Sequence, residues 1–236
     1  MRLAQLGNWL FHTRNLIFPL ALPFALFPYP VIFHNSLWAV AAGASVSLLG
    51  QALRVLTVGL KYIIRGGRNG RIYAADLVTD GVFGHMRNPM YVGNLLVVTG
   101  IAISSNCWIS VAVFMVVFGV AYAAIVAAEE EYLSGKFGEA YAAYCRDVPR
   151  WLPRLQGLGE TLRNNQFHWN RVVVKEYGTP LVWISATVLV GLQDLWPFAD
   201  DGLRRPAMLV MLTLVGATAF FSLVGWSLKK TRIVVG

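Results

Sequence analysis

Two polar segments of the sequence, residues 80–93 and 129–153, contain the side chains that are best suited to chemistry. The first segment holds Arg87, Asn88 and Tyr91 within five positions, and the second begins with three consecutive glutamates. The acidic, aromatic and basic residues of the second segment include Glu129, Glu130, Glu131, Phe137, Tyr141, Tyr144, Arg150 and Trp151. Acids beside an arginine at a membrane face are typical of a polar functional pocket. The two segments therefore predict such a pocket if the fold brings them together.

Each segment also has a purely structural explanation. Asn88 before Pro89 is typical of a helix start, with a capping side chain ahead of a proline at the first helical position. Arg87 can be a membrane anchor, and the tyrosines can be interfacial belt residues. Three acids at the end of a helix oppose the helix dipole, however, so the glutamates need a basic partner.

The elements that carry these segments are predicted to be membrane-spanning helices. Of the 236 residues, 56% are hydrophobic and 14% are charged, and the mean hydropathy is +0.55. Soluble domains carry about 25% charged residues. A span takes roughly 20 apolar residues. Six stretches meet that requirement, so we expect an all-α polytopic bundle with spans at 16–33, 37–60, 89–105, 108–128, 180–198 and 206–228.

A very short connection at residues 105–107 joins the third and fourth predicted spans. These spans should form a tight antiparallel hairpin, which brings residues 80–93 and 129–153 to the same membrane depth. Residues 129–145 have one apolar face and predict an amphipathic helix on the membrane surface. Arg54, inside the second predicted span, can extend to the cytoplasmic surface or face the bundle interior, and we favour the surface.

The charges orient the predicted bundle. Arginines and lysines cluster in residues 61–88 and 129–178 and near both chain ends, whereas the opposite side has only Arg204 and Arg205. The positive-inside rule therefore places both termini and both long loops in the cytoplasm. The net charge of +8 is explained by this rule and by anionic membrane lipids, and nucleic acid is not an expected partner. With two cysteines and four histidines, we expect neither a disulfide framework nor a metal site.

The order of these motifs resembles that of the membrane methyltransferases, which include isoprenylcysteine carboxyl methyltransferase and the phospholipid N-methyltransferases. The resemblance rests on Gly81, on the run 87–93, on the hairpin followed by Glu129-Glu130, and on a trailing pattern. It covers about residues 76–153. Many members have histidine where this chain has Asn88. The residues of the trailing pattern are Leu133, Phe137, Gly138, Tyr141, Tyr144, Val148, Arg150 and Pro153.

The resemblance implies S-adenosyl-L-methionine as methyl donor and cofactor, bound at the cytoplasmic face. The whole chain, 1–236, is then one integral membrane domain of a bacterial inner membrane, or of the endoplasmic reticulum in a eukaryote. Aromatic rings stabilise cations and arginines bind carboxylates, which suits such a ligand. Carried over by position, the cofactor-binding residues are Arg87, Asn88, Tyr91, Glu129, Glu130, Tyr141, Tyr144, Arg150 and Trp151.

The acceptor is expected to be a lipid or prenylated small molecule with a carboxylate or an amine. For an amine, the candidate bases are Glu129, Glu130 and Glu176. Segment 154–178 is either a surface linker or the acceptor contact, and in the second case Arg171 and Glu176 are catalytic candidates. It precedes the two C-terminal spans, 179–228. The alternatives are an NADPH-dependent membrane reductase of the steroid- or sterol-reductase type, and a non-enzymatic transporter or scaffold.

Overall fold

The computed structural model describes residues 3–21, 30–61, 72–195 and 201–230. In these residues the chain is helical apart from turns and one isolated bridge between Val31 and Cys107, as the composition predicts. The elements are α1 (Leu3–Ala21), α2 (Ser36–Leu60), the short 3₁₀ helix η2 (Gly81–Gly84), α3 (Pro89–Ser104), α4 (Trp108–Asp147), α5 (Leu158–Asn164), α6 (Trp169–Glu176), α7 (Gly178–Leu195) and α8 (Asp201–Lys230).

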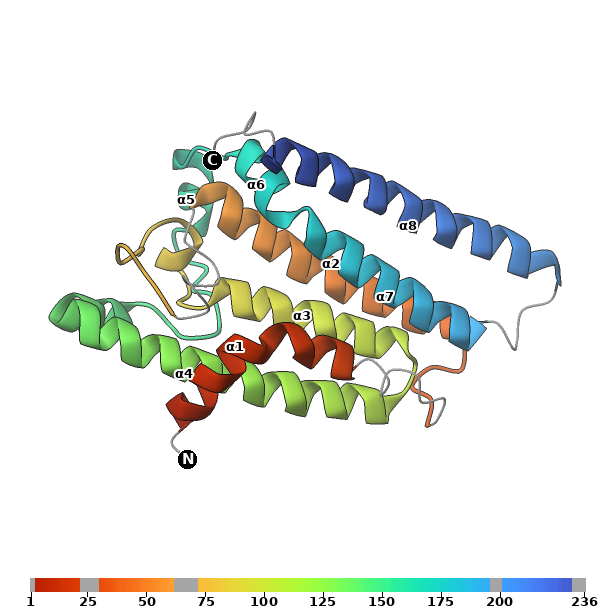
Figure 1. Cartoon of the computed structure of the whole chain (residues 1–236), viewed down its shortest axis with the longest axis horizontal. Coiled ribbons are helices and arrows are strands. Elements are labelled where there is room, and N and C mark those ends of the chain that lie inside the picture. Colours follow the sequence, from red (N-terminus) through yellow and green to blue (C-terminus); the bar gives the residue numbers. More distant parts are fainter. Residues whose placement is uncertain (1–2, 22–29, 62–71, 196–200, 231–236) are drawn as a thin grey trace.

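The long helices form a bundle whose centre is the pair α2 and α3 (Figure 1). Helix α4 packs on α3 and carries α1 on its surface, while α7 packs on α2 and α3 and is itself covered by α8. Many large apolar side chains on the outside of the helices are exposed, and in a bilayer they face lipid. Examples are Trp38, Leu48, Leu49, Val116, Val120, Leu209, Phe220 and Leu223.

Small residues allow α2 and α3 to approach very closely. A Cβ atom added to Gly100 of α3 would lie 2.2 Å from the Ser47 hydroxyl oxygen and 2.4 Å from the Gly43 carbonyl oxygen. Interfaces of this kind are common between helices in membranes, where tight packing replaces the hydrophobic effect as the driving force. Nearer the start of α3, a Cβ atom added to Gly93 would lie 3.0 Å from the Gly50 carbonyl oxygen, so α2 and α3 are also close where residues 80–93 enter the bundle.

Among the described residues, three helical segments are long and apolar enough to cross a membrane, namely Ser36–Leu60, Trp108–Asp147 and Leu212–Lys230. Shorter apolar helices occupy Pro89–Ser104 and Gly178–Gly191. The protein is thus an integral membrane helix bundle, and the number of six spans stays a prediction. Of the first predicted span, 16–33, residues 16–21 form the end of α1 (Leu3–Ala21), residues 30–33 are not helical, and residues 22–29 lie outside the described part.

The predicted surface helix 129–145 is not a separate element. Helix α4 continues from Trp108 to Asp147 and is interrupted only at Gly138, whose φ of 52° lies in the left-handed region. Glycine adopts this conformation without the steric cost that other residues meet. In Figure 1 the green ribbon of α4 changes direction at its left end, so its last turns come back towards α3.

The short connection between α3 and α4 forms the predicted hairpin. Asn106 has a φ of 51°, and its side-chain oxygen accepts a hydrogen bond of 2.8 Å from the Phe33 amide. Its side-chain nitrogen donates to the Phe33 carbonyl at 3.0 Å. At the opposite end of the bundle, the end of α2, the start of α3, the last turns of α4 and the helices α5 and α6 lie together (Figure 1). Both polar sequence segments are at this end.

Candidate active site

The side chain of Glu130 joins the two polar segments. Its Oε1 accepts hydrogen bonds from Arg87 Nη1 at 3.0 Å and from Arg150 Nε at 3.0 Å, and its Oε2 accepts one from Arg150 Nη2 at 2.6 Å. Arg87 Nη1 also donates to the sulfur of Cys145 at 3.0 Å. Glu130 therefore has two basic partners. The glutamates do not lie at a helix end, because α4 continues to Asp147, so the expected conflict with the helix dipole does not arise.

Glu129 lies in a different environment from its neighbour. Its Oε1 accepts a hydrogen bond of 2.5 Å from the Tyr91 hydroxyl, and the Tyr91 ring packs on Tyr122 with the ring centres 5.5 Å apart. Tyr91 belongs to the first turn of α3 and Glu129 to α4, so this contact also fixes the hairpin at its polar end. The predicted proximity of Arg87, Tyr91, Glu129 and Glu130 is what the structure shows.

The chain after α4 closes over the start of α3 through backbone contacts. The Arg87 amide donates to the Pro149 carbonyl at 2.9 Å, and the Asn88 side-chain nitrogen donates to the Arg150 carbonyl at 3.1 Å. The prediction that Asn88 caps α3 is wrong in this respect, because its side chain makes no capping bond and instead holds residues 149–151. These bonds place Arg150 beside Glu130.

Aromatic side chains form the wall of the site. Tyr141 and Tyr144 are buried and pack with Val148, and the Tyr144 hydroxyl donates to the Phe83 carbonyl at 2.8 Å. The change of direction at Gly138 makes this contact possible, since it turns the last part of α4 towards η2. Trp151 lies next to the Arg150 guanidinium, whose central carbon is 5.7 Å from the ring centre.

Arg87 is held as a cation inside this wall. Burial lowers the pKa of its guanidinium, but the negative charge of Glu130, together with Cys145 and Tyr141, outweighs burial and raises the pKa above its ordinary value. Its Nε is buried and has no hydrogen-bond partner among the residues that the structure describes. A buried donor without a partner is rare in proteins and points to a ligand or water at that atom.

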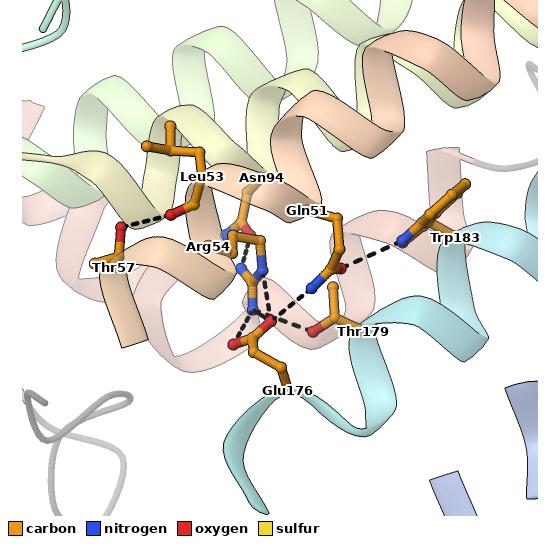
Figure 2. A network of polar contacts seen from close by, with 8 residues as sticks. All are labelled: Gln51, Leu53, Arg54, Thr57, Asn94, Glu176, Thr179 and Trp183. Carbon is orange, nitrogen blue, oxygen red and sulfur yellow. Dashed lines mark hydrogen bonds and ion pairs between the residues drawn. The ribbon is translucent and has the colours of Figure 1, made fainter. Parts of the chain in front are cut away.

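A second polar network, which the sequence did not predict, crosses the bundle between α2 and α6 (Figure 2). Arg54 donates to Glu176 from Nε at 2.9 Å and from Nη2 at 3.0 Å, and both side chains are almost fully buried. Arg54 also binds Asn94 of α3 and the Thr179 hydroxyl of α7. The expectation that Arg54 reaches the membrane surface is wrong, because four helices converge on its guanidinium.

Gln51 extends the network. Its side-chain nitrogen donates to Glu176 at 3.4 Å, and its oxygen accepts from the Trp183 indole at 3.3 Å (Figure 2). Thr179 lies in the first turn of α7, which begins at Gly178, and its hydroxyl oxygen accepts the hydrogen bond from Arg54. The only signal in the sequence for this network is a set of polar residues inside apolar stretches.

Segment 154–178 is more ordered than a surface linker. It contains α5 and α6, and Arg154 binds His85 through a backbone bond of 2.9 Å. Phe167 packs against Met86 and Met90, which flank the Arg87-Asn88 pair. Arg171 donates to the Val58 carbonyl at 3.4 Å. Arg171 and Glu176 therefore lie against α2, on one side of the start of α3, whereas Glu130 lies on α4, on the other side.

Comparison with known proteins supports the motif order. Residues 38–140 match the model of the phospholipid methyltransferase family. The cobalt-zinc-cadmium resistance protein CzcN of Cupriavidus metallidurans is 30% identical over 213 residues, which cover 85% of this chain and 89% of that protein. The chain belongs to this family of membrane methyltransferases. Family membership supports methyl transfer as its class of reaction. No solved structure matches the chain.

Two further relatives extend the family. The protein-S-isoprenylcysteine O-methyltransferase of Schizosaccharomyces pombe is 32% identical over 53% of this chain and 55% of that enzyme. The protein-S-isoprenylcysteine O-methyltransferase B of Arabidopsis thaliana is 32% identical over 49% of this chain and 60% of that enzyme. The chain thus spans little more than half the length of these two methyltransferases. The substrates of those two enzymes are carried over to this methyltransferase only as a proposal.

Proposed function

We propose that the protein transfers a methyl group from S-adenosylmethionine to a lipidic acceptor at the cytoplasmic face of the membrane. The observation that carries the proposal is the ion-pair cluster of Arg87, Glu130 and Arg150. It joins the ends of two apolar helices, and it lies at the end of the bundle where the positively charged loops collect. Family membership supplies the class of reaction.

The residues of the cluster fit the chemistry of this cofactor. S-adenosylmethionine supplies an activated methyl group on a sulfonium and carries a carboxylate, an ammonium and a ribose. The Arg150 side chain is 36% exposed and can bind a carboxylate, and the buried Nε of Arg87 is a donor that still needs a partner. Glu129 and Glu130 can accept from ammonium or hydroxyl groups. We assign Asn88, Tyr91, Tyr141, Tyr144 and Trp151 to the walls of the same site.

Positioning and the exclusion of water are the main tasks of the protein in a direct displacement. Tyr141 and Tyr144 exclude water from the inner wall. An amine acceptor must lose a proton, and we propose Glu129 as the base, since Glu130 is already bound to two guanidinium groups. Tyr91 holds the Glu129 carboxylate in place. A carboxylate acceptor needs no base.

For the acceptor we propose that Arg171 contacts the polar end of the lipid. It lies on α6 beside the end of α2, where an anionic head group meets the cytoplasmic surface. Glu176 is 3% exposed and binds Arg54, so it has little surface to offer a substrate. We therefore propose that Glu176 is a positioning residue, which holds α6 and hence Arg171 against the bundle.

Binding measurements on the purified protein in detergent test the cofactor site. We expect S-adenosylhomocysteine to bind and NADPH not to bind. Arg87→Ala or Glu130→Gln should weaken S-adenosylhomocysteine binding about tenfold or more, which corresponds to about 1.4 kcal/mol. Glu131→Gln is the matched control, because this neighbouring acid is exposed and lies outside the cluster.

Three results would overturn the assignment. Equal affinity in the wild type, Glu130→Gln and Glu131→Gln would reduce the cluster to a structural anchor. Tight binding of NADPH instead of S-adenosylhomocysteine would favour the reductase alternative. Binding of neither ligand by folded protein would favour a transporter or scaffold.

The name of the relative that matches most of the chain provides a physiological setting. CzcN is named a cobalt-zinc-cadmium resistance protein, and we propose that this protein contributes to tolerance of the same metals through methyl transfer. Growth of a strain without the gene, with and without a Glu130→Gln copy, tests this setting. Normal growth of the deleted strain in the presence of each of the three metals would contradict the proposed role in metal tolerance.

A further inference from the structure

A groove of about 550 Å³ lies between the junction of α6 and α7 and the end of α8. Its wall combines two lysines from different helices with a tyrosine, a threonine and apolar side chains. The lining residues are Val174, Lys175, Tyr177, Gly178, Thr179, Val182 and Lys229. The helices that line it, α6, α7 and α8, lie on the other side of the α2–α3 pair from α4, which carries Glu130 (Figure 1).

We propose that this groove binds the head group of an anionic phospholipid that stays with the protein and is not the methyl acceptor. Lys175 and Lys229 bring two positive charges to one groove, and both occupy the last turn of their helices. The adjacent acid, Glu176, is directed to Arg54 in the bundle interior, so its charge is neutralised away from the groove. The charge of the groove is therefore complementary to a phosphate.

The shape of the groove favours a lipid over a soluble anion. It lies where α6, a short amphipathic helix, turns into the apolar helix α7, so one end meets the membrane surface and the other meets the hydrocarbon. Val182 lies on the hydrocarbon side, one turn into α7, and is exposed. A phosphate beside the lysines would leave its acyl chains beside Val182 and the apolar face of α8.

Lysines in the last turn of a helix also stabilise the helix dipole, and that effect alone needs no ligand. The last two lysines of α8 can distinguish lipid binding from stabilisation of the helix dipole, because only one of them lines the groove. Lys229 lines the groove with its Nζ 5.6 Å from the Tyr177 ring centre, and Lys230 lies outside the lining with its Nζ 5.1 Å from the Trp226 ring centre. Both have the same charge, a similar aromatic contact and the same helix end.

The test measures binding of phosphatidylglycerol to the purified full-length protein in detergent, by the rise in its unfolding temperature during titration. Lys229→Gln and Lys175→Gln should each weaken the binding about fivefold, since one cation near a lipid surface contributes about that much. Lys230→Gln should change it less than twofold. Binding of S-adenosylhomocysteine should stay unchanged in all three variants, which separates this site from the proposed cofactor site.

Three outcomes would contradict the proposal. Equal effects of Lys229→Gln and Lys230→Gln would mean that only the overall charge attracts lipid. An equal temperature rise with phosphatidylcholine would show that the groove does not select for negative charge. An equal rise with glycerol phosphate would show that a soluble phosphate suffices and that no lipid is required.

Discussion

Arg54 and Glu176 form the most deeply buried ion pair described here, and their energetic role differs from that of the Glu130 cluster. Both partners have desolvated charges and depend on each other. Replacing such a pair with apolar residues is often neutral, whereas removing one partner leaves an uncompensated buried charge. The pair therefore makes the correct docking of α6 a condition for a stable bundle.

We expect Glu176→Ala to destabilise the protein by about 3–5 kcal/mol, because Arg54 would stay buried without its anion. The double variant Arg54→Met, Glu176→Met should recover most of this loss. Thermal unfolding in detergent measures both effects. Glu160→Ala, which removes an exposed acid of α5, is the control. If Glu176→Ala unfolded at the temperature of Glu160→Ala, the pair would not hold α6.

At the residue scale the sequence predicted the Glu130 cluster but not the Arg54 network. The proximity of the members of the cluster follows from the hairpin of the third and fourth predicted spans. Because the connection at 105–107 is short and the two spans are similar in length, their far ends lie at the same membrane depth. Arg54 and Glu176 are 122 residues apart, and their contact depends on how α6 and α7 pack on α2. No local pattern encodes that packing, so surface exposure was the wrong expectation for Arg54.

At the scale of elements, Gly138 decides the shape of the site. It allows α4 to change direction, and the returning turns carry Tyr141, Tyr144 and, beyond them, Arg150. The sequence predicted both halves of α4 as helical, but it placed the boundary at residue 129. The break was missed because glycine inside an apolar helix is also common at packing contacts, and periodicity alone does not separate these roles.

We expect Gly138→Ala to cost about 1–3 kcal/mol, because alanine at a φ of 52° is strained. Relief of the strain by straightening α4 would also move Tyr144 and Arg150 and weaken S-adenosylhomocysteine binding. Gly135→Ala is the matched control, since neither glycine has a neighbour within 4 Å of an added Cβ and only Gly138 has a positive φ. Equal stability and affinity in the two variants would show that the break is not required.

At the scale of the whole molecule, the structure gathers at one end the loops that carry most of the positive charge. The positive-inside rule places this end in the cytoplasm. A water-soluble cofactor would then reach the Glu130 cluster from the cytoplasm, and a lipidic acceptor would reach it from the bilayer. The all-α membrane bundle and its polar end were predictable from composition and charge, whereas the number of six spans stays a prediction and the helix α1 (Leu3–Ala21) was not predicted.

Cysteine labelling in intact cells tests this orientation. In a background with Cys107 and Cys145 replaced by serine, we expect an impermeant maleimide to modify His34→Cys and to modify Asn164→Cys only after permeabilisation. Both positions are exposed and lie at opposite ends of the bundle. Labelling of Asn164→Cys alone in intact cells would reverse the orientation and remove the cytoplasmic active site.

The wide sequence separation within the Arg54 network also matters during synthesis. At about 5–20 residues per second, the ribosome needs roughly 6–24 s to reach Glu176 after Arg54. During that interval α2 enters the bilayer with an arginine near its loop end, which costs up to about 2.5–3.5 kcal/mol. Asn94 follows Arg54 by 40 residues and is its earliest partner within the network. A nascent chain that ends before α6 therefore exposes an uncompensated charge to lipid, a feature by which membrane proteases can distinguish incomplete from complete molecules.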